Sequence, residues 1–383
     1  MLIKPNIDKV ARIKVVGVGG AGGNALNSMI TQGNIVGVDF MAINTDKQDL
    51  NMNKADEILQ IGTQLTNGLG SGALPDIGKK AAEESIEEIK QHLKGYDMIF
   101  IAAGMGGGTG TGASPVIAKL ARDSGALTVA VVTKPFKFEG STRLQNAEEG
   151  ILNLKENVDA LITIPNQKLL EVEQKSLPLK EAFLLSDNIL TFGVKGISDL
   201  IVHPGLINVD FADVKTIMKD AGSALMGIGT ASGENRAEKA AEQAIHSPLL
   251  DANVTGATGI LINITSDPSL TLEEVQKVSE YVVNAAGTEV NVILGANPDE
   301  DLKDTINVTV IATGFETEYS SGFGSDFSGG VFKPAPKSVF ENEDDQKFST
   351  KDSKDKDVDL DFIDEDDAPD KDPYRIPPFL RRG

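Results

Sequence analysis

Apolar runs alternate with amphipathic stretches along the first part of the chain. The apolar runs have the length and composition of buried strands, and stretches with helical spacing are expected at about 78–93 and from about Gly112. Strands and helices in this alternation are typical of a mostly parallel sheet with helices on both faces. The pattern therefore predicts an α/β fold. The expected strands are 12–19, 38–44, 56–62, 97–104, 127–135 and 160–166.

A long helix is expected next. Apolar residues recur at three-, four- and seven-residue spacings from Leu179 to Ile201, the stripe of a helix about 35 Å long at ~1.5 Å per residue. A helix of this length can bridge two domains. After His203 the alternation restarts and ends near Gly314, which predicts a second, smaller α/β domain. Its expected strands are 223–232, 257–266, 289–297 and 306–314. Three helices are expected: one from about 211, one from about 234 and one at 272–286.

The composition changes after residue 315. Gly, Ser, Asp, Lys and Pro dominate, and 341–372 holds fifteen acids against five lysines, about half of the net charge of −21. Such blocks of like charge repel one another and stay unfolded. The predicted parts are therefore a first domain, a central helix, a second domain, a disordered acidic linker and a terminal peptide: 1–178, 179–203, 204–315, 316–371 and 372–383.

Composition excludes several classes of function. The chain contains no cysteine, which rules out thiolate catalysis and suits a reducing compartment. No apolar run reaches the roughly 18 residues of a membrane helix, and the N-terminus lacks the pattern of an export signal. The net negative charge argues against sequence-independent nucleic-acid binding. We therefore expect a cytoplasmic protein.

Two glycine-rich loops each follow an expected strand and precede an expected helix, where free amide groups favour an anion. The first, 17–24, contains GxGxxG, with Asp39 about twenty residues further on. By itself this motif is weak. It fits a dinucleotide site of a dehydrogenase, and it also fits a tight strand-to-helix turn without a ligand.

The second loop is more specific. Six of the nine residues from Gly104 to Gly112 are glycine, and the loop stands between a buried strand and a helix. Glycine lets backbone amides point toward phosphate oxygens, and Thr109 and Thr111 add hydroxyl donors. A flexible linker would not occupy this place in a sheet. No GxxxxGK[ST] motif occurs, so backbone amides, a divalent ion and Arg143 are expected to neutralise the phosphates.

The segment GGGTGTG at 106–112 resembles the signature loop of the tubulin and FtsZ family. The resemblance extends over about 10–315 and is closest to the bacterial members. Ala21 departs from the family pattern, because glycine is commoner at this position. Alanine would be tolerated there if its backbone φ is negative. The segments that carry the resemblance are 17–24, 44–46, 68–78, 135–143, 164–166 and 208–213, together with Asp187, and 372–382 resembles the family's C-terminal docking peptide.

The resemblance implies that the first domain is a Rossmann-like GTP-binding domain, with GTP or GDP and Mg²⁺ held mainly by phosphates, and it leaves a role for K⁺ open. Glu139 and Arg143 would meet ribose and phosphate, while Phe183 and Asp187 would recognise guanine. Read without the family, Phe183 fits a core position better. The implied nucleotide-binding residues are Gly19, Gly20, Ala21, Gly22, Gly23, Asn24, Asn44, Gly104, Gly106, Gly107, Gly108, Thr109, Gly110, Glu139, Arg143, Asn166, Phe183 and Asp187.

Asn208, Asp210 and Asp213 have two interpretations. From the residues alone, Asn208 or Asp210 caps the following helix and Asp213 complements its dipole. The resemblance implies instead that the three are catalytic and act on the GTP of the neighbouring subunit by orienting the attacking water.

The resemblance also implies a function. Subunits would stack head to tail into filaments of the division ring at midcell, and GTP would be hydrolysed at each contact. The terminal peptide would bind membrane-tethering and regulatory division proteins. Its implied contact residues are Ile376, Pro377, Phe379, Leu380 and Arg381. The alternatives are an NAD-dependent dehydrogenase, supported by the first loop and Asp39, and a GTP-binding carrier that does not polymerise.

Overall fold

The structure is a computed structural model of the 383-residue chain. It describes residues 11–33, 35–172, 178–202, 205–250, 254–287, 290–300 and 302–315. In these ranges no helix is both long enough and apolar enough to cross a membrane. The predicted linker at 316–371 and the predicted docking peptide at 372–383, with Ile376, Pro377, Phe379, Leu380 and Arg381, lie outside the described residues.

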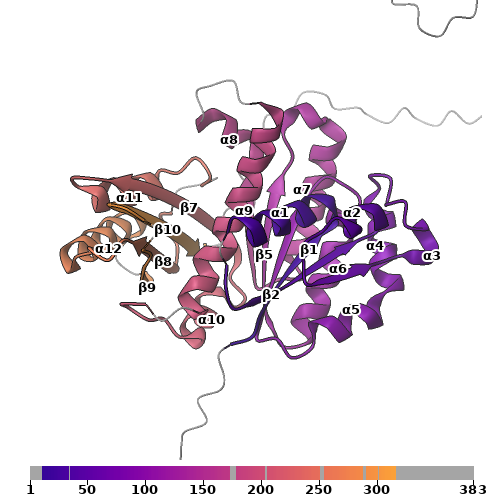
Figure 1. The fold of residues 1–383 in the computed structure, drawn as a ribbon, viewed down its shortest axis with the longest axis horizontal. Coiled ribbons are helices and arrows are strands. Elements are labelled where there is room, and N and C mark those ends of the chain that lie inside the picture. Colours follow the sequence, from indigo (N-terminus) through magenta and orange to yellow (C-terminus); the bar gives the residue numbers. More distant parts are fainter. Residues whose placement is uncertain are drawn as a thin grey trace, which may run out of the picture. The chain divides into compact units, whose positions relative to one another are not determined.

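The described strands form one sheet in the order β3-β2-β1-β4-β5-β6-β7-β10-β8-β9 (Figure 1). β10 is antiparallel to β7 and β8, and the other neighbours are parallel. The two predicted sets of strands meet at β6 and β7, which pair only from Ala160 opposite Gly222 to Ile162 opposite Ala224. The strands are β1 (Ile13–Val18), β2 (Val38–Asn44), β3 (Glu57–Gln60), β4 (Met98–Gly104), β5 (Leu127–Lys134), β6 (Ala160–Pro165), β7 (Gly222–Ser232), β8 (Gly259–Ser266), β9 (Asn291–Pro298) and β10 (Thr305–Thr313).

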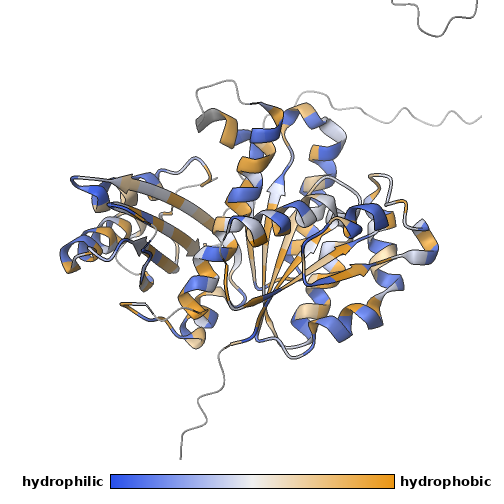
Figure 2. Cartoon of the chain, in the orientation of Figure 1, coloured by the Kyte–Doolittle hydropathy of each residue, from blue (hydrophilic) through white to orange (hydrophobic). Residues whose placement is uncertain are grey.

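Helices cover both faces of the first six strands, and apolar residues fill the space between sheet and helices (Figures 1 and 2). This arrangement confirms the predicted α/β class. The helices are α1 (Gly19–Thr31), α2 (Lys47–Asn51), α3 (Thr63–Thr66), α4 (Pro75–Glu84), α5 (Ile86–Leu93), α6 (Thr109–Asp123), α7 (Ser141–Lys155), α8 (Asn166–Val172), α9 (Leu179–Val202), α10 (Phe211–Met218), α11 (Arg236–Ile245) and α12 (Leu272–Ala286), with a 3₁₀ turn at Lys137–Glu139.

The long helix α9 contributes to a core shared by both sets of strands. Ile189, Leu190 and Val194 are buried in one apolar cluster with Leu26 of α1 and Leu261 of β8. Since a single cluster reaches from α1 to β8, α9 is the bridge that its apolar stripe predicts. On the far side of the second set of strands, α11 and α12 enclose a separate core.

The structure corrects several of the expected helix boundaries. The stretch expected as one helix at 78–93 is two helices, α4 and α5, separated by Ser85, whose Oγ accepts a hydrogen bond from the amide of Gly62. α4 begins earlier than expected because Pro75 occupies its first turn, where the missing N–H costs nothing. α1 and α6 begin inside the glycine-rich loops, at Gly19 and Thr109. Their first turns therefore present backbone amides directly.

Candidate nucleotide-binding site

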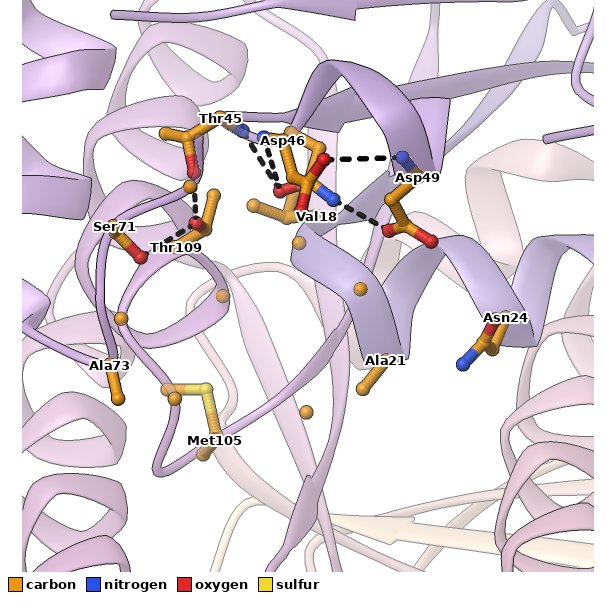
Figure 3. Close-up of a pocket in the computed structure, with 18 of the residues that line it drawn as sticks. Val18, Ala21, Asn24, Thr45, Asp46, Asp49, Ser71, Ala73, Met105 and Thr109 are labelled. Atoms are coloured by element: carbon orange, nitrogen blue, oxygen red, sulfur yellow. Dashed lines mark hydrogen bonds between the residues drawn. The ribbon is translucent and has the colours of Figure 1, made fainter. Parts of the chain in front are cut away.

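A cavity of about 750 Å³ opens where several parallel strands of the first set end (Figure 3). Gly104 ends β4, Asn44 ends β2, and Asn166 follows β6, and all three line the cavity. The carboxyl ends of parallel strands are the usual place for ligands in such folds, and the volume is in the range of small-molecule sites.

Most of the predicted nucleotide-binding residues line this one cavity. Gly22, Gly23 and Gly106 do not, and each has close neighbours instead. A Cβ on Gly22 would lie 2.4 Å from the Ala102 carbonyl oxygen, so this glycine allows α1 to pack on β4. The lining set is Gly19, Gly20, Ala21, Asn24, Asn44, Gly104, Gly107, Gly108, Thr109, Gly110, Glu139, Arg143, Asn166, Phe183 and Asp187.

The N-termini of α1 and α6 both face the cavity. Neither helix has a side-chain cap, so the amides of their first turns are free for a ligand. Gly19 has φ +71, which favours glycine. A Cβ there would lie 2.8 Å from the Gly110 amide nitrogen, so the missing side chain allows the two loops to approach each other closely. Ala21 does not have a positive φ, so alanine can replace the commoner glycine at this position without backbone strain. The arrangement fits a phosphate group.

Phe183 and Asp187 lie one turn apart on α9 at another part of the cavity wall. Phe183 is 41% exposed, which excludes the core position that its spacing favoured. Its ring packs edge-on against Phe136, with 5.6 Å between the ring centroids. Burial raises the pKa of Asp187 to about 7. Nearby, the Ser186 hydroxyl donates to Asn166 Oδ1 at 2.9 Å. An aromatic face beside a half-buried carboxylate suits a heterocycle with N–H donors.

Arg143 and Glu139 form an ion pair at the cavity, with 2.6 Å between Nη1 and Oε2. Glu139 also accepts a hydrogen bond from the Phe136 amide, which fixes its position. Half of the Arg143 side chain remains exposed, so the guanidinium can also reach an anion.

Two further acids, Asp46 and Asp49, line the cavity near the first loop, and sequence reasoning did not place them there. A Cβ on Gly20 would lie 3.5 Å from Asp49 Oδ2. Burial and the nearby charge of Asp46 raise the pKa of Asp49, partly offset by a hydrogen bond from Asn44. Within the described residues no cluster of metal-ligating side chains occurs. Acids beside a phosphate cradle fit a cation such as Mg²⁺ that is bound chiefly by the phosphates.

Sequence reasoning also missed Thr45 and Ser71, whose hydroxyls contact Thr109 at the cavity edge (Figure 3). The resemblance included segments 44–46 and 68–78, but hydroxyl contacts between separate loops leave no periodic signal in a sequence.

Asp39, the acid that supports a dinucleotide site, lies elsewhere. It accepts a hydrogen bond from the Tyr96 hydroxyl at 2.6 Å near the amino end of β2, whereas the cavity lies at the carboxyl end. The first glycine loop and Asp39 therefore do not converge on one ligand, which removes the feature that favoured a dehydrogenase.

Asn208, Asp210 and Asp213 are exposed at the start of α10 and do not line the cavity. Asp210 caps α10 by accepting from the Asp213 amide at 2.8 Å, and Asn208 Oδ1 accepts from the Gly205 amide at 2.6 Å. The capping interpretation is therefore correct for Asp210. The Asp213 carboxylate has no hydrogen bond or ion pair within the described part of the chain.

A model of the tubulin/FtsZ family GTPase domain matches residues 12–174, and a model of the FtsZ family C-terminal domain matches residues 222–316. The structure of an empty FtsZ dimer from M. jannaschii is 48% identical, with a TM-score of 0.77, over 80% of this chain and 89% of that one. CetZ2 from Haloferax volcanii, a GTPgS-bound protofilament, has a TM-score of 0.69 at 23% identity, over 79% of this chain and 92% of that one. This second similarity concerns the fold alone.

Proposed function

Because the chain belongs to the FtsZ family, within the tubulin/FtsZ family of GTPases, we propose that it is a self-assembling GTPase whose filaments form the cell-division ring. The cavity binds GTP, with phosphates on the amides of α1 and α6 and guanine between Phe183 and Asp187. Asp187 accepts hydrogen bonds from N1 and N2 of guanine, a donor pair that adenine lacks.

The position of Asp213 supports the proposal that hydrolysis needs a neighbouring subunit. The cavity walls hold phosphate-binding amides, whereas the exposed carboxylate of Asp213 lies on α10, outside the cavity. A second copy can bring its Asp213 to the phosphates of the first. Asp213 then orients and polarises the attacking water, while Asp210 fixes the backbone of Asp213. Asn208 completes the group through its amide.

Exposed apolar side chains support this contact. Leu69 is 85% exposed and Met52 is 67% exposed, and both line the cavity. Leu206 is 63% exposed, two residues before Asn208. Apolar groups beside each half of a divided active site fit a contact between two different surfaces, which repeats without closing and produces a filament.

The remaining assignments follow the family. Residues 1–178 form the GTP-binding domain, 179–203 the central helix, and 204–315 the domain that activates the neighbour. Mg²⁺ would accompany the nucleotide on its phosphates, and Asp46 and Asp49 are carboxylates of the cavity lining that could face it. The terminal peptide at 372–383 binds membrane-tethering and regulatory division proteins, so that the filament assembles in the cytoplasm at midcell.

The direct test separates binding from turnover. We expect Asp213→Ala to bind GTP with unchanged affinity and to lose hydrolysis, while Thr216→Ala on the same helix face serves as the control with normal turnover. Asp187→Ala should bind GTP poorly but keep its catalytic carboxylate. A mixture of the two defective variants should recover turnover. Normal hydrolysis by Asp213→Ala alone would show that this carboxylate is not catalytic.

A further inference from the structure

Three hydroxyl groups from separate segments meet beside the phosphate cradle (Figure 3). Oγ1 of Thr109, the first residue of α6, lies 2.7 Å from Thr45 Oγ1 and 3.0 Å from Ser71 Oγ. Thr45 is 0% exposed, Thr109 7% and Ser71 8%. Buried hydroxyls cannot turn to bulk water, so their contacts with one another decide where each proton points.

The number of protons restricts the possible arrangements. Each hydroxyl donates one hydrogen bond and can accept two. Two hydrogen bonds join the three groups, so one proton remains for an acceptor outside the trio. Among the described residues, Thr45 Oγ1 and Ser71 Oγ have no other hydrogen-bond partner. All three residues line the cavity, and Thr109 is the one that stands in the first turn of α6, between Gly108 and Gly110.

A phosphate oxygen in the cavity would therefore select one arrangement. Thr109 donates to the phosphate, and Thr45 and Ser71 then both donate to Thr109 Oγ1. A hydroxyl that accepts two hydrogen bonds becomes a stronger donor, because adjacent hydrogen bonds polarise one another. Without a phosphate, the Thr109 proton can turn to water in the cavity or to Thr45 or Ser71, so no single arrangement is selected.

We propose that Ser71 and Thr45 are positioning residues for the nucleotide phosphates, acting through the Thr109 hydroxyl. The inference rests on the proposed GTP site. It adds hydrogen bonds that run from Ser71 and Thr45 to Thr109, and from Thr109 to the phosphate. Ser71 belongs to the segment between α3 and α4 that also carries the exposed Leu69. The trio thus joins the first turn of α6 to the segment that carries Leu69.

The test compares ligands with and without phosphates. Ser71→Ala and Thr45→Val each remove one donor to Thr109, and we expect each to bind GTP and GDP about fivefold more weakly. Binding of guanosine should not change, because guanosine has no phosphate. Thr45→Ser keeps the hydroxyl and should bind GTP like the wild type.

Thr66→Val is the matched control. The Thr66 hydroxyl is buried in the same region and lies 2.9 Å from the Gly62 carbonyl oxygen and 3.3 Å from the Thr45 carbonyl oxygen, and it contacts none of the three hydroxyls of the trio. Its loss should lower the unfolding midpoint without changing the ratio of GTP to guanosine affinity. Wild-type GTP affinity in Ser71→Ala, or an equal loss for guanosine and GTP, would overturn the inference. Absence of GTP binding by the wild type would instead refute the proposed function.

Discussion

Asp187 lies half-buried in the cavity wall, and this burial raises the pKa of its carboxyl group to about 7. Only the ionised form can accept both guanine hydrogen bonds, so binding should release a proton and weaken as the pH falls through 7. Between about pH 8 and pH 6 we expect GDP affinity to fall about tenfold. Titration calorimetry at several pH values measures this change.

Asp187→Asn is the control for the pH effect. Asparagine binds guanine more weakly at every pH, and its affinity should be almost constant from pH 6 to pH 8. A wild-type affinity that does not change over this interval would show that Asp187 is already ionised in the free protein, or that it does not contact the ligand.

At the scale of single residues, sequence reasoning was strongest where chemistry depends on the backbone. The glycines of the second loop pointed to a ligand site because few other roles require so many in one turn, and most of them line the cavity. Phe183 needed the family resemblance, since its spacing on α9 by itself favours a core position. The Thr45, Thr109 and Ser71 contacts depend on how three loops pack and could not be predicted.

Among the helices, α11 depends on a charge network around Arg236. This side chain is 5% exposed, and its five N–H donors match five hydrogen bonds. The acceptors belong to Asp267, Ser269, Glu274 and Asp304, so one guanidinium joins the segments after β8 and before β10 to α11. The Arg236 contact lowers the pKa of Glu274.

We expect Arg236→Met to lower the free energy of unfolding by about 2 kcal/mol, because it leaves carboxylates without their partner. Lys277→Met is the control, since Lys277 pairs with Glu273 and Glu238 at the surface, and its loss should have little effect. Denaturant titration measures both variants. Equal stability of the two variants would contradict the structural role assigned to Arg236.

Helices were predictable where both ends carry local signals. The bounds of α12 were predicted correctly, because Thr271 and Glu274 form a capping box and Gly287 takes φ +119. α11 was expected from Glu234 but begins at Arg236, since Asn235 has φ +58 and cannot continue a helix. The break at Ser85 depends on its contact with Gly62, which is distant in the sequence.

For the whole molecule, the central feature is that the proposed phosphate-binding groups line the cavity, whereas the proposed catalytic carboxylate of Asp213 lies outside it. A GTP-binding carrier that does not polymerise would have no reason to hydrolyse GTP faster at higher protein concentration. A filament-forming enzyme with a divided active site must do so, because a lone subunit lacks the group that activates water.

The most direct measurement is GTP turnover per subunit against protein concentration, with light scattering recorded in parallel. Turnover per subunit should be nearly absent below a threshold concentration and should rise at the concentration where scattering begins. Asp213→Ala should assemble above a similar threshold but remain inactive. Constant turnover per subunit on dilution to monomers would contradict a site completed by the neighbouring molecule.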